Sequence, residues 1–104
     1  IFIAYTYAMK IVGARPNAFK IGWAYDFKQR ARQFNHAAMP GLGGLEYKPF
    51  RFHLWDTARQ AFAMEQGLIA QLSARKHPDN GEIVQGLSDD GLDALWIAAI
   101  SDRL

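Results

Sequence analysis

The sequence predicts an α+β domain in which a small antiparallel three-stranded sheet is flanked by helices, in the order β-β-α-β-α-α. Three observations predict this class: segments that alternate with the two-residue period of strands, segments with helical spacing, and breaker residues between them. The 104 residues fit a single domain, residues 1–104, and half of them are hydrophobic, which is enough to form a core. The chain has no cysteine, so disulfides and thiolate chemistry are excluded.

Two antiparallel strands open the predicted order. The stretch IFIAYTYAM, residues 1–9, alternates large and small side chains, and FKIGWA, residues 19–24, resumes the same period. Between them, KIVGARPNA contains a glycine, a proline and an asparagine, which are residues that favour a loop. A hairpin of two strands is the simplest arrangement of these segments.

A helix is predicted from Asp26 to about His36, followed by a third strand. Asp26 and Gln29 have the spacing of a capping box, in which the carboxylate accepts hydrogen bonds from free backbone N–H groups. The helix should end before Pro40 and the GLGG segment. The aromatic-rich stretch LEYKPFRFHLW then alternates like a strand, and Pro49 predicts that this strand is broken or lies at an edge.

The rest of the chain is predicted to be helical apart from one turn. TARQAFAMEQGLIAQLSARK, residues 57–76, has the clearest helical pattern, with Thr57 or Asp56 as its cap. HPDNGEIVQG is expected to form a turn and a short apolar piece. A final helix over residues 88–101, capped by Ser88, is expected as an accessory element of the domain.

Two charged residues lie where their helices should be apolar. Glu65 falls in the middle of the stripe that contains Phe62 and Ile69, and Arg30 falls beside Phe34 on the covered side of the first helix. A desolvated carboxylate without a partner would cost roughly several kcal/mol, so something is expected to face Glu65. One interpretation is that Arg30 and Glu65 converge at the mouth of a cleft over the sheet. The other is a buried Arg–Glu pair that only sets the packing.

The charge of the chain is distributed unevenly along its length. Residues 1–59 carry nine Lys and Arg against three Asp and Glu, whereas residues 60–104 carry three against seven. A basic half interleaved with aromatic residues suits contact with a nucleic-acid backbone, because cations displace condensed counterions and aromatic faces stack on bases. A solvated positive surface without a partner is the other interpretation.

Four pieces of the sequence follow one another in a suggestive order: TY in the first strand, KIG in the second, DFKQRAR at the start of the first helix, and a lone Glu inside a later helix. Together they resemble the GIY-YIG nuclease superfamily, and most of all its phage and bacterial domains with KIG as the second motif. The resemblance covers the chain from about Tyr5 to Val84. An arginine eight residues after the glycine of KIG, with DF just before it, makes the set fairly specific.

The resemblance implies a role for each residue that matches a motif. Tyr7 matches the tyrosine of the first motif, with Tyr5 as its neighbour and substitute, and Lys20 stands in the second motif. Arg30 matches the catalytic arginine and Glu65 the metal-binding glutamate. The implied activity is hydrolysis of a phosphodiester, with one Mg²⁺ or Mn²⁺ on Glu65, a water activated or oriented by Tyr7, and phosphoryl charge stabilised by Arg30.

The sequence also departs from the family's pattern. The first motif lacks its glycine, and Lys20 replaces the tyrosine of the second motif. A lysine there is expected to bind the scissile phosphate or, at a lowered pKa, to accept a proton. Tyr5 and Tyr7 are two large aromatic residues on one face of the first strand, where such residues are more often part of the core. The alternative is that neighbouring positive charge lowers the pKa of the phenol, so that it acts as a general base or orients a water.

Further residues are expected to contact the substrate. Gly22 would let the backbone or the substrate approach closely, and Lys28 and Arg32 would bind nucleic acid through their charge. Asn80 is the counterpart of a polar residue near the end of the family's pattern. His77 is the one histidine expected near the site, and the three histidines have no spacing that suggests a metal triad.

These observations predict a metal-dependent endonuclease domain that acts on DNA in preference to RNA. The first alternative is a nucleic-acid-binding module that keeps the scaffold without hydrolysis. The second is a protein-interaction domain that uses the acidic final helix and Trp96.

The expected surroundings of the protein follow from its hydropathy and its first residue. No apolar run approaches the roughly 20 residues that cross a bilayer, so we expect a soluble, cytoplasmic protein without a membrane partner. Because the chain starts at Ile1, we expect either trimmed ends or a fragment of a longer protein whose other domains are its partners, and the resemblance implies a bacterial or phage source.

Overall fold

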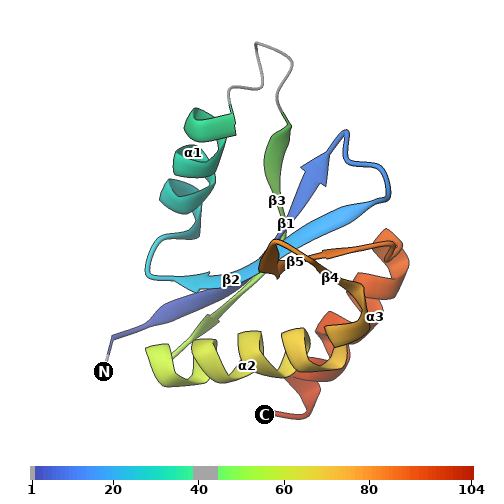
Figure 1. Ribbon diagram of the computed structural model, residues 1–104. Coiled ribbons are helices and arrows are strands. Elements are labelled where there is room, and N and C mark those ends of the chain that lie inside the picture. The colour runs from blue at the N-terminus through green and yellow to red at the C-terminus, as the bar shows by residue number, and fades with distance from the viewer. Residues whose placement is uncertain (1, 39–44) are drawn as a thin grey trace.

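The computed structural model describes residues 2–38 and 45–104, and within them the α+β class is confirmed. These residues form one antiparallel five-stranded sheet in the order β3-β1-β2-β5-β4, together with three α-helices and one 3-10 turn (Figure 1). The elements are β1 Ala4–Val12, β2 Ala18–Ala24, α1 Phe27–Ala38, β3 Glu46–Trp55, α2 Ala58–Gln71, the 3-10 turn Ser73–Arg75, β4 Lys76–His77, β5 Asn80–Gln85 and α3 Asp89–Ser101.

The predicted number of three strands is wrong, because a second hairpin extends the sheet. β5 pairs with β2 over Ala18–Lys20, and the two-residue strand β4 pairs with β5. The segment NGEIVQ has only two adjacent apolar residues and a glycine, so it lacks the alternation that identifies a strand. It becomes a strand because β2 offers it an unpaired edge, and pairing is set by this tertiary context more than by propensity.

The predicted first hairpin and edge strand are both present. β1 and β2 pair antiparallel from Tyr5 opposite Ala24 to Lys10 opposite Phe19. β3 lies at the edge of the sheet, as Pro49 predicts, because proline has no N–H to donate to a further strand. The register between β1 and β3 shifts beside this proline, which is the irregularity that a β-bulge produces.

The helices lie on both sides of the sheet. α2 and α3 lie on one side and α1 on the other (Figure 1). The side chains of β1 divide between the two faces by their two-residue period: Ala4 and Ala8 belong to the core under α2 and α3, whereas Tyr7 and Met9 belong to a smaller cluster with α1.

The core under α2 and α3 is the larger of the two. Its fully buried side chains come from the sheet and both helices, and burying each contributes about 1.5–3 kcal/mol. They include Phe19, Ile21, Met64, Leu68, Val84 and Leu92.

The final helix is part of this core. Leu92, Trp96 and Ala99 of α3 are buried within it. Two ion pairs tie the helix to the sheet: Lys10 Nζ lies 2.7 Å from Asp89 Oδ2, and Arg51 Nε lies 2.6 Å from Asp93 Oδ1.

The predicted helix starts are confirmed. The carboxylate of Asp26 accepts from the N–H of Gln29 at 3.0 Å, Thr57 and Gln60 form a reciprocal capping box, and Ser88 caps α3. The long helix is shorter than predicted: it stops at Gln71, and residues 73–77 form the 3-10 turn and β4. None of the described helices is long and apolar enough to cross a membrane.

Candidate active site

A cleft opens where the sheet is incomplete. Within the described residues, β5 covers only the first three residues of β2, so the edge of β2 from Ile21 to Ala24 is unpaired on that side. There α1 on one side of the sheet and α2 on the other border a common cavity of about 410 Å³. It is lined by Tyr7, Lys20, Trp23, Arg30, Phe34, Phe62, Glu65 and Glu82.

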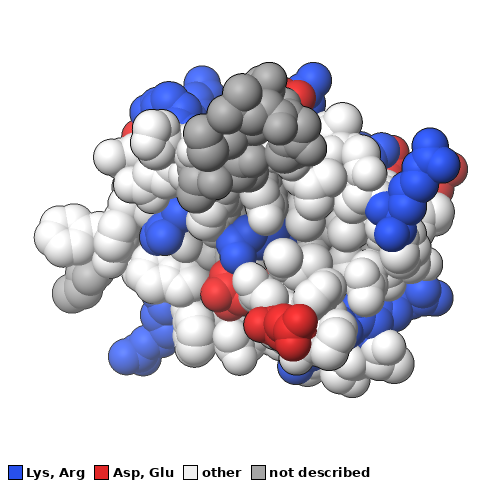
Figure 2. Space-filling view, turned by 45° about the horizontal axis from the view of Figure 1, so that its top comes forward, with Lys and Arg blue, Asp and Glu red and all other residues white. Residues whose placement is uncertain are grey.

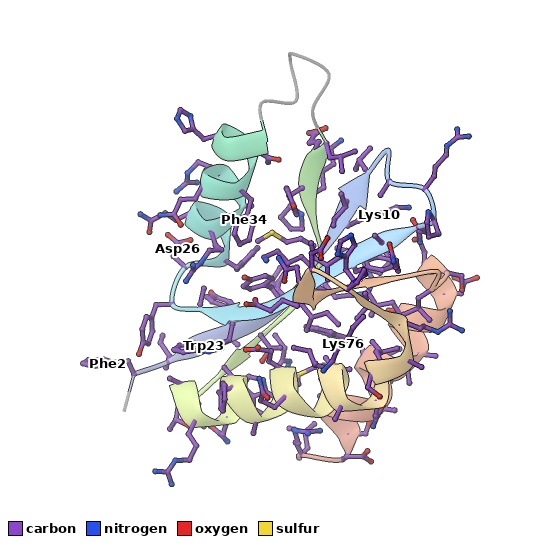
Figure 3. The ribbon with its side chains drawn as sticks, in the orientation of Figure 1. Phe2, Lys10, Trp23, Asp26, Phe34 and Lys76 are labelled. Atoms are coloured by element: carbon purple, nitrogen blue, oxygen red, sulfur yellow. The ribbon has the colours of Figure 1, made fainter. Side chains whose placement is uncertain are left out.

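Figure 2 shows acidic and basic side chains next to one another near the middle of the visible face. The cleft has the same mixed character, with two cations and two carboxylates among its lining residues. Three aromatic rings complete its wall, and Figure 3 shows two of them, Phe34 on α1 and Trp23 on β2 near α2.

Tyr7 reaches the cleft by lying across Gly22. The two residues are directly opposite each other in the β1–β2 ladder. A Cβ on Gly22 would collide with the Tyr7 hydroxyl and would come within 2.6 Å of its Cζ. The glycine therefore makes room for the phenol. The group that approaches Gly22 is thus a side chain of the protein itself, whereas the sequence led us to expect the backbone or the substrate there.

Lys20 lies on the same strand, one strand period before Gly22. It is 9% exposed, and its Nζ lies 4.8 Å from the centre of the Phe34 ring. A cation over an aromatic face is stabilised by the ring quadrupole. Phe34 of α1 thus helps to hold the ammonium at the cleft.

Arg30 comes from the first turn of α1, and the helix is fixed at both ends. Asp26 caps its start, while Asn35 binds the backbone of the edge strand twice. The Asn35 side chain donates to the carbonyl of Tyr47 at 2.9 Å and accepts from its N–H at 2.6 Å. The guanidinium of Arg30 is exposed and forms no salt bridge within the described part of the chain.

Glu65 comes from the middle of α2, which is anchored one turn earlier. The buried hydroxyl of Thr6 donates to the Ala61 carbonyl at 2.8 Å and ties the helix to β1. Glu65 is 6% exposed, and its one side-chain hydrogen bond among the described residues comes from Gln66 at 3.3 Å. Glu65 and Arg30 line the same cavity without a salt bridge between them, so the buried Arg–Glu pair is not formed.

The environment of Glu65 opposes its negative charge. Burial raises the pKa of its carboxyl above the usual value, and the nearby carboxylate of Glu82 raises it further. The hydrogen bond from Gln66 and the charge of Lys20 partly offset this rise in the pKa. A buried carboxylate beside a second one is a site that a cation would stabilise.

The expectation of a lowered pKa for Tyr7 is wrong. Burial raises the pKa of its phenol to about 12, and the charge of Arg30 lowers it by less than burial raises it. Glu82 and Glu65 raise it further. Tyr7 is therefore protonated at neutral pH, and its chemistry there is to donate an O–H hydrogen bond and to orient what it contacts.

Six predicted site residues are not among those that line the cleft in the described part of the chain, and one of them, Gly22, lies against the Tyr7 ring. Tyr5 packs its ring edge against Phe27, with 4.9 Å between centroids. Lys28 and Arg32 are exposed on α1. The two remaining residues cap the β4–β5 turn: the Asn80 side chain accepts from the N–H of Glu82, and the His77 ring accepts from the N–H of Asp79.

Glu82, Trp23 and Phe62 line the cleft but were not predicted as site residues. Phe62 lies one turn before Glu65, so its spacing contained the signal. The alternation of β2 puts Trp23 on the face opposite Lys20, with Phe19 and Ile21, so the spacing of Trp23 contained no such signal. Glu82 follows the turn between β4 and β5, a hairpin that the sequence pattern does not predict. It lies one residue beyond the last β2–β5 pair, Lys20 with Ile83, and nothing in the sequence alone indicates that position.

The donor set of the cleft suits a hard divalent cation held by few protein ligands. Carboxylate oxygens are the protein ligands that Mg²⁺ prefers, and Mg²⁺ commonly keeps several waters beside one or two carboxylates. Glu65 supplies one buried carboxylate, and Glu82 a second at the same cavity. The described residues contain no cluster of three or more acidic or histidine side chains suited to a metal.

The fold and the cleft define a class of protein: an α+β domain with an antiparallel sheet whose incomplete edge forms a polar cavity of mixed charge. Comparison with family models, curated proteins and solved structures finds no match to this chain.

Proposed function

We propose that this domain is a metal-dependent endonuclease that hydrolyses phosphodiester bonds in DNA, or in RNA. The observation that carries the proposal is that Tyr7, Lys20, Arg30 and Glu65 line one cavity, although they come from four different elements. These are the residues that match the motifs of the GIY-YIG superfamily in the sequence. Apolar packing does not require them at one place, whereas phosphoryl transfer needs cations, a carboxylate and a water-orienting group together.

In this proposal Arg30 contacts the phosphate directly. Its guanidinium is exposed at the cleft and forms no salt bridge among the described residues, so its donors are available to a ligand. A planar guanidinium binds two phosphoryl oxygens at once and stabilises the charge that develops on them during hydrolysis.

Lys20 and Tyr7 act from the floor of the cleft. The Lys20 ammonium, held over Phe34, attracts the phosphate and partly balances Glu65. With its pKa raised to about 12, Tyr7 keeps its proton and orients the attacking water through its hydroxyl. The glycine opposite it leaves the space that the Tyr7 ring and hydroxyl occupy.

Glu65 would hold a divalent cation, with Glu82 near enough to share in balancing its charge. Such a cation supplies Lewis-acid polarisation of a phosphoryl oxygen and lowers the pKa of a bound water. The raised pKa of Glu65 supports this assignment, since a buried carboxylate without a cationic hydrogen-bond partner is stabilised by a cation.

The experiment that tests the proposal is cleavage of end-labelled DNA and RNA, single-stranded and duplex, in Mg²⁺, Mn²⁺ or EDTA. We expect cleavage by the parent in metal, none in EDTA, and loss of cleavage in Glu65→Ala and Glu65→Gln. The second variant removes the charge while keeping the shape of the side chain, so its loss would report the charge.

The matched control is Glu46→Gln, which removes a carboxylate on β3 that does not line the cleft. It should cleave as the parent does. The proposal fails if folded Glu65→Gln still cleaves at the parent rate, or if no substrate is cut in any metal.

A nucleic-acid-binding module without hydrolysis is the alternative that one observation favours. Lys20 stands where the second motif has a tyrosine, so one phenol is missing from the cleft. Binding that weakens with salt, with no turnover in either metal, would support this alternative.

A further inference from the structure

A second hollow of about 300 Å³ lies beside the cleft and shares Arg30 with it. It begins where β2 passes into α1, at the residues just after the KIG strand. It is lined by Ala24, Tyr25, Asp26, Gln29, Arg30 and Gln33. None of these residues except Arg30 has a role in the proposed hydrolysis.

The side chains of this hollow suit a flat, neutral, hydrogen-bonding group. Tyr25 offers a ring that is 57% exposed and therefore accessible to a ligand for stacking. Gln29 and Gln33 offer amides that both donate and accept, and Asp26 offers an acceptor. A carboxylate disfavours a phosphate at this position, whereas exocyclic amino groups of nucleobases pair well with amides and carboxylates.

The position of the hollow relative to the cleft points to the same ligand. Arg30 lines both cavities, so a phosphate bound by its guanidinium has the cleft on one side and this hollow on the other. Trp23 lines the cleft, and its ring meets that of Tyr25 edge to face, with 5.5 Å between centroids. Figure 3 shows Trp23 on β2 and Asp26 where the chain enters α1.

We propose that this hollow binds one unpaired nucleobase next to the phosphate held by Arg30, so that the substrate is a single strand. The inference rests on the proposed function for the phosphate at Arg30. The base stacks on Tyr25 and presents its Watson–Crick edge to Gln29 and Gln33. In a duplex that edge is occupied by the complementary base, so paired strands do not fill the site.

The test is binding of fluorescent oligonucleotides at low salt in EDTA, where cleavage does not interfere. We expect a single strand to bind at least tenfold more tightly than a duplex of equal length. Tyr25→Ala should weaken single-strand binding roughly tenfold or more, because stacking on one aromatic ring contributes on that scale. Tyr25→Phe keeps the ring and should bind within about threefold of the parent.

A control variant and a second readout test whether the ring of Tyr25 itself contacts the base. Phe52→Ala removes another exposed ring, 54% exposed on β3, that lines neither hollow, and it should leave binding unchanged. Quenching of tryptophan fluorescence gives a second readout, since Trp55 and Trp96 are 4% and 3% exposed, whereas Trp23 lines the neighbouring cleft and contacts the ring of Tyr25. Single strands should quench the fluorescence of the parent and should quench it less at equal concentration in Tyr25→Ala.

The inference and the proposed function fail in different ways. Single-strand binding that depends on the ring of Tyr25, without cleavage in Mg²⁺ or Mn²⁺, would support the hollow and overturn the nuclease. Cleavage of duplex with Tyr25→Ala as active as the parent would support the nuclease and overturn the hollow. Equal binding of both strand types, equal losses in Tyr25→Ala and Tyr25→Phe, or no binding at all would also overturn it.

Discussion

The face of the sheet under α2 and α3 differs from the face under α1 in what its side chains do. Under α2 and α3, buried apolar residues from the sheet and both helices form a continuous core, and the one charged residue of α2 that is buried is Glu65. Under α1, the buried cluster is small: Tyr7, Met9, Ala24, Phe27 and Ala31. The candidate site forms at the border of the two, where, in the described part of the chain, no strand pairs with β2 beyond the three residues that β5 covers.

The two regions differ in the polar groups that they can accommodate. A closed core requires every position to be apolar and well packed, because each void or unpaired group costs stability. At the open edge of β2, Arg30 and Glu82 are exposed to solvent, and the nearly buried ammonium of Lys20 lies over the Phe34 ring. The comparison predicts that variants of the two regions affect different measurements.

The largest loss of stability is expected from the core face. Leu68 is 0% exposed on α2, and Leu68→Ala should lower the free energy of unfolding by about 2–5 kcal/mol because it leaves a cavity. Urea denaturation would measure it. Ile97→Ala makes a similar truncation at a side chain that is 58% exposed and should change the free energy by less than about 0.5 kcal/mol. Equal losses for the two would mean that this face is not the main core.

The next effect is expected at the open edge and should affect activity without affecting stability. Arg30→Ala should lower the cleavage rate by roughly 10²–10³-fold, the usual effect of removing one preorganised donor to a developing oxyanion. Because Arg30 is exposed, the melting temperature of the Arg30→Ala variant should stay near that of the parent protein. Arg30→Lys should restore little, since an ammonium does not bind two oxygens as a guanidinium does.

Arg59→Ala is the control for Arg30. It removes an exposed arginine from α2 that does not line the cleft. It should keep most of the activity. An equal loss in Arg59→Ala would mean that the effect of Arg30 is general attraction of nucleic acid by positive charge.

Gly22→Ala should lower both the free energy of unfolding and the cleavage rate, because Gly22 lies in the sheet and contacts Tyr7 of the site. The added methyl would collide with the Tyr7 ring, and overpacking of this kind costs about 1–3 kcal/mol. Gly81→Ala is the matched control, since a Cβ there would meet nothing within 4 Å. In the double variant with Tyr7→Leu, the two losses should be less than additive, which a double-mutant cycle would detect. Full additivity would contradict the close approach of Gly22 and Tyr7.

The parts of the fold that depend on local chemistry could be predicted from the sequence. Asp26, Thr57 and Ser88 begin the helices because their side chains accept backbone hydrogen bonds, and this signal lies within four residues. The β4–β5 hairpin could not be predicted, because β5 owes its pairing to an edge of β2 some sixty residues earlier. The count of strands was therefore wrong although the α+β class is confirmed.

The residues of the candidate site also fall into those that the sequence predicts and those that it does not. Arg30 and Glu65 could be predicted because a charge on an apolar stripe violates the helical pattern, and the violation is visible in the sequence. Asn35 and Glu82 could not be, because Asn35 acts through the backbone of β3 and Glu82 through the end of a β2–β5 ladder. The raised pKa of Tyr7 was missed for a related reason: the sequence gives the neighbouring cation but not the depth of burial, which has the larger effect.

The smallest expected effect is a gain of stability when the charge of Glu65 is removed from the site. Burial and Glu82 raise the pKa of Glu65, so the folded state binds this proton more tightly than the unfolded chain does. Stability from this group is therefore present at low pH and is lost as pH rises through the raised pKa. In EDTA near pH 8, Glu65→Gln should raise the free energy of unfolding by about 1 kcal/mol, or roughly 4–8 °C in melting temperature.

The dependence of this gain on pH and metal shows whether it comes from removing the buried negative charge of Glu65 or from the glutamine side chain as such. The difference between Glu65→Gln and the parent should shrink as pH falls toward 4.5, the ordinary value for the carboxyl, because the parent then becomes neutral as well. Mg²⁺ should stabilise the parent but not the variant, since a ligand that binds only the folded state raises its stability. A variant less stable than the parent in EDTA at all pH values would mean that Glu65 is held by hydrogen bonds that favour its charged form. The open edge would then add to the stability of the fold, and the functional contrast between the two faces of the sheet would be lost.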